Sequence, residues 1–158
     1  MMHTIKIEEI PVAHIEEFWE IHFRYLIDDG IITDEEDMEY FQSAEYRDVI
    51  KAHMIRRVDQ HHMLYFVRNG VRIGAAQYNT YHSEDGKCFV LDFWVFPEFR
   101  GNGMGHKCYE TLEKYTKAQD ARYYELNVNK ENSARFWASL GFVDHGEDEW
   151  GMKLMVKL

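Results

Sequence analysis

A glycine-rich loop after an apolar strand is the feature that most narrows what this chain can fold into. The loop, residues 101–105, has three glycines and lies between an apolar run over 88–96 and a helical pattern over 104–118. Glycine adopts positive φ and lets a ligand approach the backbone closely, while a helix N-terminus offers unpaired N–H groups and the positive end of a dipole. We therefore expect a phosphate cradle, with Arg100 adding charge at its lip. The alternative is a tight turn that needs glycine only for packing.

The spacing of the loop fits two familiar nucleotide-binding motifs badly. A P-loop requires Gly-Lys followed by Ser or Thr, whereas Gly105 is followed by His106, Lys107 and Cys108. A dinucleotide fingerprint reads G-x-G-x-x-G within an early βαβ unit. Here the pattern is G-x-G-x-G, and it follows four expected strands with about 50 residues of the chain left.

Hydrophobic periodicity predicts a mixed α/β fold in a single domain, residues 1–158. A capping box, Thr33 with Glu36, opens a second helix that runs toward Arg57. The order is β-α-α-β-β-β-α-β-α-β-β. The expected strands cover 4–10, 62–67, 71–81, 88–96, 121–128 and a final pair within 142–156, and the helices cover 14–29, 33–57, 104–118 and 133–140.

Composition excludes several classes of function. With 158 residues and a formal net charge of −10, the chain is a poor candidate for binding nucleic acid or anionic lipid. It shows neither a run of about 18 apolar residues nor a signal peptide, so we expect a cytoplasmic protein without a membrane partner. Cys88 and Cys108 do not make a disulfide framework, and the nine histidines lack metal-ligand spacing, so no metal is expected.

Three segments in order resemble the GCN5-related N-acetyltransferases, the GNAT superfamily. The loop Arg100-Gly101-Asn102-Gly103-Met104-Gly105 matches the family pattern [Q/R]-x-x-G-x-[G/A]. The match extends back over Leu91-Asp92-Phe93-Trp94-Val95-Phe96-Pro97-Glu98-Phe99, and forward to Asn132–Phe142, which ends in Gly-Phe. The resemblance covers about residues 88–142 and implies a mostly antiparallel sheet of six to seven strands with helices on both faces.

The resemblance implies that acetyl-CoA binds between the strand ending near Val95 and the strand ending near Val128. The pyrophosphate would lie on the loop N–H groups, and the pantetheine arm would pair with the strand around Val95. The cofactor-binding residues implied in this way are Trp94, Val95, Phe96, Arg100, Gly101, Asn102, Gly103, Met104, Gly105, His106, Asn132 and Trp137.

The reaction implied is direct attack of a primary amine on the acetyl carbonyl. The backbone N–H near Val95 would polarise that carbonyl. Asp92 is the candidate general base, because it is the only charged residue inside an apolar strand and a carboxylate buried there is costly unless it is paired or used. The alternative is a carboxylate that only hydrogen-bonds a neighbouring loop.

The chain departs from the family pattern at two positions. Trp137 stands where the family has a tyrosine general acid, and an indole N–H is not a proton source near neutral pH. The hydroxyls of Tyr109, Tyr123 and Tyr124 cannot be placed from the sequence. Lys130 occupies the position of the family's cofactor-binding asparagine, with Asn129 and Asn132 on either side, and of these we favour Asn132.

The acceptor side of the expected site is acidic. Residues 28–39 hold seven acidic residues and no basic one, which favours a cationic small molecule or a peptide amine. The alternative is that these acids only complement a helix N-terminus. Aromatic residues at helical spacing could line the acceptor pocket or form core, namely Trp19, Phe23, Tyr25, Tyr40 and Phe41.

Three matters stay open at the level of sequence. One is a different acyl-CoA donor on the same fold, and another is a CoA-binding sensor without turnover. The third is a homodimer: a strand is expected over 152–158, and in some members of the resembled family the equivalent strand mediates dimers.

Overall fold

The computed structural model describes residues 4–158, which form one seven-stranded sheet and five α-helices. The strands are β1 (Ile5–Glu9), β2 (His61–Arg68), β3 (Val71–Thr80), β4 (Lys87–Val95), β5 (Tyr123–Val128), β6 (Val143–Glu147) and β7 (Lys153–Lys157). The helices are α1 (Ile15–Asp28), α2 (Glu35–Gln42), α3 (Ala44–Ile55), α4 (Met104–Lys117) and α5 (Glu131–Ser139).

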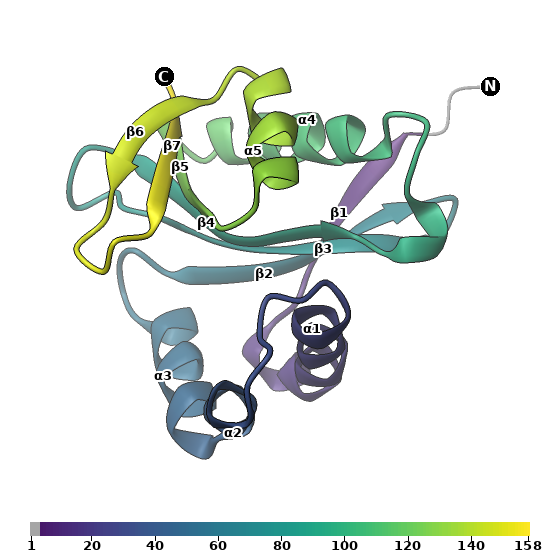
Figure 1. Ribbon diagram of the computed structural model, residues 1–158, viewed down its shortest axis with the longest axis vertical. Helices are drawn as coiled ribbons and strands as arrows, with labels where there is room; N and C mark the ends of the chain where they lie inside the picture. Colours follow the sequence, from purple (N-terminus) through teal and green to yellow (C-terminus); the bar gives the residue numbers. More distant parts are fainter. Residues whose placement is uncertain (1–3) are drawn as a thin grey trace.

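The sheet has the order β1-β2-β3-β4-β5-β7-β6. Its only parallel pair within the described chain is β4 with β5, and every other neighbouring pair is antiparallel. The three N-terminal helices lie on one face, and α4 and α5 lie on the other (Figure 1). The expected mixed, mostly antiparallel sheet with helices on both faces is confirmed.

Two apolar layers hold the helices to the sheet, one on each face. Side chains of a strand alternate between faces, and β4 shows this at its end: Val95 joins the layer under α4 and α5, whereas Trp94 joins the layer under α1. Asp92, two residues before Trp94, shares the α1 face. No helix within residues 4–158 has the length and apolar character that crossing a bilayer requires.

The prediction of one long second helix over 33–57 is wrong, because the structure has two helices there, α2 and α3. Asp34, not Thr33, caps α2, because its side chain accepts the N–H of Asp37 at 2.7 Å. The chain then breaks at Ser43, which is extended (φ −74°, ψ 150°) and begins α3 by accepting the N–H of Tyr46 at 3.2 Å. A serine that bonds nearby backbone groups competes with helix continuation, and this accounts for the additional helix.

Replacing Ser43 by alanine is expected to lower the free energy of unfolding by about 1 kcal/mol, because the α3 N–H groups lose their cap. Urea denaturation followed by circular dichroism measures the change. Asp34→Ala, which removes the cap of α2, is the comparison for a single lost cap. Unchanged stability in both variants would contradict these assignments.

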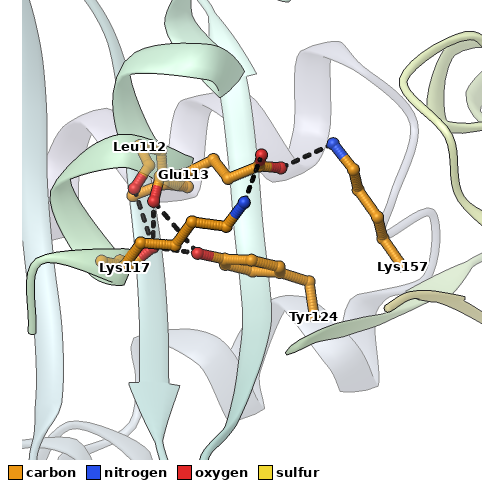
Figure 2. Close-up of polar contacts among 6 residues, drawn as sticks. Leu112, Glu113, Lys117, Tyr124 and Lys157 are labelled. Atoms are coloured by element: carbon orange, nitrogen blue, oxygen red, sulfur yellow. Dashed lines mark hydrogen bonds and ion pairs between the residues drawn. The ribbon is translucent and has the colours of Figure 1, made fainter. Parts of the chain in front are cut away.

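A polar cluster fixes the second half of α4 against β5 and β7 (Figure 2). Glu113 of α4 accepts from Lys157 at 2.7 Å and from Lys117 at 3.2 Å. The Tyr124 hydroxyl donates to the backbone oxygen of Glu113 at 3.1 Å and lies 2.7 Å from the Thr116 hydroxyl. Burial raises the pKa of Glu113, but its lysine and tyrosine donors outweigh that effect and lower the pKa overall. The cluster holds α4, and hence its N-terminal loop, in place over the sheet.

Candidate active site

Strands β4 and β5 separate part of the way along their length. Their ladder pairs Lys87–Val90 with Tyr123–Leu126 and stops there. At that point β4 carries a bulge opposite β3, because Gln77 pairs with Asp92 while Tyr78 pairs with Val90, which leaves Leu91 without a partner in the register. A bulge bends its strand. The bend turns the end of β4 away from β5 and opens the sheet.

A cavity of about 680 Å³ occupies this opening. Its floor is the separated ends of β4 and β5, and α5 forms one side. The end of α1 and the loop before α4 close two further sides. The residues that line it include Tyr25, Asp29, Asp92, Phe93, Trp94, Val95, Arg100, Gly101, Gly105, Asn127, Asn129, Lys130, Phe136, Trp137 and Met152. The cavity therefore lies between the strand ends near Val95 and Val128, where the family resemblance implies a cleft.

The loop before α4 presents consecutive N–H groups on an open stretch of backbone. Gly101, Asn102 and Gly103 all have positive φ, at 97°, 55° and 72°. A Cβ atom on Gly101 or Gly103 would meet nothing within 4 Å, so this face of the backbone is open. The N–H groups of Gly101, Asn102 and Gly103 donate to no other described residue, whereas the N–H of Met104 donates to the Gly101 carbonyl at 3.1 Å. Such consecutive free donors at a helix N-terminus bind anions.

Gly105 has a different role, in packing. A Cβ there would lie 2.8 Å from Cε1 of Phe136, so glycine allows α4 and α5 to approach each other. Met104 is buried below the loop. His106 Nε2 lies 2.8 Å from the Ser139 hydroxyl, which ties α4 to α5 a second time. The packing interpretation thus applies to Gly105, whereas the backbone at Gly101 and Gly103 is open, as a ligand cradle would require.

Arg100 does not extend freely over the loop. Its Nε donates to the Val95 carbonyl at 2.7 Å, and its Nη2 pairs with the Asp29 carboxylate at 2.7 Å. Lys130 donates to the backbone oxygen of the same Asp29. The end of α1 is thereby joined to both sides of the cavity mouth. The charge of Arg100 at the lip is present, as expected, but it is partly neutralised by Asp29.

The N–H of Val95 points toward the cavity. Phe96 donates its N–H to Ile73 of β3 at 2.8 Å. Successive backbone groups of a strand face opposite edges, so the N–H of Val95 faces away from β3, on the edge where the Val95 carbonyl meets Arg100. The geometry suits a donor to a carbonyl oxygen in the cavity. The N–H of Phe96, in contrast, is occupied within the sheet.

Asp92 is held by two side chains and keeps one oxygen free. Its Oδ2 accepts from Gln77 Nε2 at 2.7 Å and lies 3.1 Å from His22 Nε2. The side chain is 16% exposed. No described residue hydrogen-bonds Oδ1, and Asp92 lines the cavity. Two fixed donors offset the cost of burying the carboxylate, and the free oxygen is available to a ligand.

An aromatic wall adjoins Asp92 on the α1 side. The rings of Tyr25 and Trp94 stack at 4.2 Å with an angle of 7°. Burial, together with the charges of Asp92 and Asp29, raises the pKa of the Tyr25 hydroxyl. Tyr25 therefore remains a hydroxyl at neutral pH and can donate a hydrogen bond there. Of the five aromatic residues considered from the sequence, Tyr25 lines the cavity, whereas Trp19 is core.

The remaining expected residues divide by location. Trp137 lines the cavity and packs edge-on against Tyr109 and Phe93. Asn129 also lines it, whereas Asn132 lies on the exposed side of α5 and accepts from Arg135. The hydroxyls of Tyr123 and Tyr124 bond Asp85 and Thr116 respectively, and neither these tyrosines nor Tyr109 line the cavity.

Sequence reasoning missed His22 and Gln77. His22 is 2% exposed in α1 and lies on the buried stripe with Phe18 and Leu26, at the spacing of a core residue. A histidine on an apolar helix stripe was the available signal. Gln77 is a fully buried amide in the middle of β3, and its position opposite Asp92 depends on the register set by the bulge.

Comparison with known proteins agrees with this geometry. A family model described as the acetyltransferase (GNAT) family matches residues 15–142. The PaiA N-acetyltransferase of Thermoplasma acidophilum, solved with coenzyme A, has a TM-score of 0.71 and 20% identity, with 98% of each chain covered.

Two further solved structures share the fold at lower identity. RimL, a ribosomal L7/L12 α-N-protein acetyltransferase solved with coenzyme A, has a TM-score of 0.72 and 13% identity over 98% of this chain and 94% of its own. An acetyltransferase of Thermus thermophilus has a TM-score of 0.69 and 14% identity, with 99% of each chain covered. No curated protein matches the sequence. The expected family and enzyme class are confirmed: the chain belongs to the acetyltransferase (GNAT) family of N-acetyltransferases.

Proposed function

We propose that this protein transfers the acetyl group of acetyl-CoA to a primary amine in the cavity between β4 and β5. The observation that carries the proposal is a single cavity bordered by the three kinds of group that acetyl transfer requires. These are the open N–H array that begins at the cavity-lining Gly101, the inward N–H of Val95 and the free Oδ1 of Asp92. The coenzyme A in the structures of PaiA and RimL supports the choice of donor.

Different residues of the cavity bind different parts of acetyl-CoA. The loop N–H groups hold the pyrophosphate, and the edge of β4 at Val95 holds the pantetheine arm. The acetyl carbonyl accepts the Val95 N–H, which stabilises the oxyanion as it forms. Trp137 and the aromatic residues around it form the apolar side of the cavity.

Asp92 removes the proton from the amine. A primary amine has a pKa of about 10, so it is almost entirely protonated at pH 7 and cannot attack. Oδ1 takes one proton from the ammonium group, and the nitrogen attacks the carbonyl carbon. The carbon–sulfur bond breaks to give the CoA thiolate, and the nitrogen releases its second proton to solvent as the amide forms. The thiolate takes its proton from solvent, because Trp137 supplies none and the raised pKa of Tyr25 limits that residue to hydrogen bonding.

The acceptor we infer is cationic, either a small polyamine-like molecule or a peptide amine. Asp92 offers a carboxylate oxygen beside the stacked rings of Tyr25 and Trp94. A carboxylate next to aromatic faces suits an ammonium group. The acids of residues 34–37 contribute less specifically, because Asp34 is engaged as a helix cap.

Release of CoA thiol from acetyl-CoA tests the function directly. We expect turnover with at least one class among polyamines, aminoglycosides and lysine-bearing peptides, and none with neutral amides. Propionyl-CoA and succinyl-CoA, supplied in parallel, separate acetyl transfer from use of a longer acyl group. Binding of acetyl-CoA without turnover on any amine would contradict the proposal and would indicate a CoA sensor.

A further inference from the structure

A chain of buried polar side chains runs from Asp92 into the sheet. Gln77 donates to Asp92 Oδ2 at 2.7 Å, and its Oε1 lies 2.7 Å from Nε2 of His61. Nδ1 of His61 lies 2.9 Å from Oδ1 of Asn79, whose Nδ2 donates to the Asp59 carbonyl at 3.0 Å. His61, Gln77 and Asn79 are all at most 3% exposed. Four consecutive hydrogen-bond contacts thus join the proposed base to the far end of β3.

Both ends of this chain are acceptors: the Asp92 carboxylate and the Asp59 carbonyl. An amide that bridges two neighbours accepts through oxygen on one side and donates through nitrogen on the other. A chain with an acceptor at each end must therefore contain one member that donates on both sides. Among the three bridging residues only His61 can do so, and only when both of its ring nitrogens carry protons.

Two proton arrangements satisfy every contact. In the first, Asp92 is a carboxylate, His61 is an imidazolium and Gln77 is oriented as found. In the second, Oδ2 of Asp92 carries a proton and donates to Gln77, whose amide is turned by half a rotation and donates to Nε2 of a neutral His61. One proton has left Nε2 of His61 and one is bound at Oδ2 of Asp92, so the net charge of the pair is zero in both arrangements.

Opposing influences act on the equilibrium between these two proton arrangements. Burial lowers the pKa of His61 to about 4, against the opposing effects of its two amide partners and of Asp92. Burial therefore favours the second arrangement, whereas a cationic amine beside Asp92 favours the first. The other titratable side chains around the pair are His22 and Tyr25 of α1, Tyr46 and His53 of α3, and the Glu9–His62 pair of β1 and β2.

We propose that His61 and Asp92 share one proton through Gln77, and that His61 thereby sets the pH range in which Asp92 acts as a base. The inference rests on the proposed function of Asp92. His61 does not line the cavity and acts only through Gln77, so it is a positioning residue. Its charged form holds Gln77 in the orientation that leaves Asp92 ionised.

Nuclear magnetic resonance of protein with ¹⁵N-labelled histidine tests the shared proton without turnover. In the unmodified protein we expect a His61 imidazolium component that grows when a polyamine is added without acetyl-CoA, because the cationic amine favours the first arrangement. In Asp92→Asn the new amide can donate into the chain from that end, so a neutral His61 satisfies every contact and the imidazolium component disappears. An identical His61 titration in both proteins would overturn the proposal. Because this readout needs no turnover, it separates the proposal from the acetyltransferase assignment.

The pH dependence of kcat/KM tests the consequence for catalysis. In His61→Gln no member of the hydrogen-bonded series donates on both sides, so the contacts that favour the ionised carboxylate of Asp92 are lost. We expect the acidic limb to move up by about one pH unit, which is a rate about tenfold lower on that limb, with recovery at alkaline pH. The control is His62→Gln, since His62 is the adjacent histidine and pairs with exposed Glu9. A uniform loss at every pH, as a structural role would give, would overturn the proposal.

Discussion

Replacing Asp92 by asparagine is expected to lower kcat about 10²- to 10⁴-fold, the range that a positioned general base contributes. Asparagine keeps the shape of the side chain and a contact with Gln77, but it cannot take the proton from an ammonium group. The affinity for acetyl-CoA is expected to stay within about twofold, because the loop and the Val95 N–H are untouched. Initial rates of thiol release, with calorimetric binding in parallel, measure both quantities.

The pH dependence of the rate loss in Asp92→Asn gives a second test of the general base. A primary amine loses its proton unaided near pH 10, so the difference between the variant and the unmodified enzyme is expected to narrow as the pH rises toward that value. Asp85→Asn is the control, because Asp85 is an exposed carboxylate that pairs with Tyr123 away from the cavity. A loss of less than tenfold at pH 7 would show that Asp92 is not the base.

Replacing Gly103 by glutamate is expected to weaken acetyl-CoA binding about 100-fold or more. The new carboxylate would enter the open N–H array and face the pyrophosphate, and a like-charge contact costs several kcal/mol. Quenching of tryptophan fluorescence measures the dissociation constant, since Trp94 and Trp137 both line the cavity.

The chain offers a closely matched control for that substitution. Gly70 has φ of 76° against 72° for Gly103, and a Cβ at either position meets nothing within 4 Å. Gly70→Glu thus imposes a similar backbone strain in the β2–β3 turn, away from the cavity. Equal loss of binding in the two variants would mean that strain, not the phosphate site, is responsible.

The parts of the fold that local patterns encode were predictable. The apolar run over 88–96 lies on β4, the glycines mark its passage into α4, and both elements agree with the structure within a few residues. Asp92 could be singled out because a charge inside an apolar strand is conspicuous. These features depend on neighbours in the sequence, where periodicity and propensity operate.

The features that depend on register or on distant contacts were not predictable. Ser43 is a serine within a helical pattern, and its bond to the N–H of Tyr46, which apolar spacing does not reveal, marks the break between α2 and α3. The bulge at Leu91 decides both the separation of β4 from β5 and the contact of Gln77 with Asp92. Arg100 reaches Asp29 over 71 positions of sequence.

The asparagine near α5 illustrates the limit within the candidate site. Spacing alone left Asn129 and Asn132 as alternatives, and the family pattern gave no decision because Lys130 holds the position between them. The start of α5 after Lys130 places Asn129 on the cavity and Asn132 in the first turn of the helix, away from it. A shift of a few residues at a helix start turns a side chain to another face.

Calorimetric titration of acetyl-CoA into the unmodified protein tests the central claim most directly, since every assigned role requires that ligand in the cleft between β4 and β5. The account predicts one saturable site per chain with micromolar affinity, retained in Asp92→Asn and lost in Gly103→Glu. No saturable binding to the unmodified protein, or equal binding to Gly103→Glu, would contradict it.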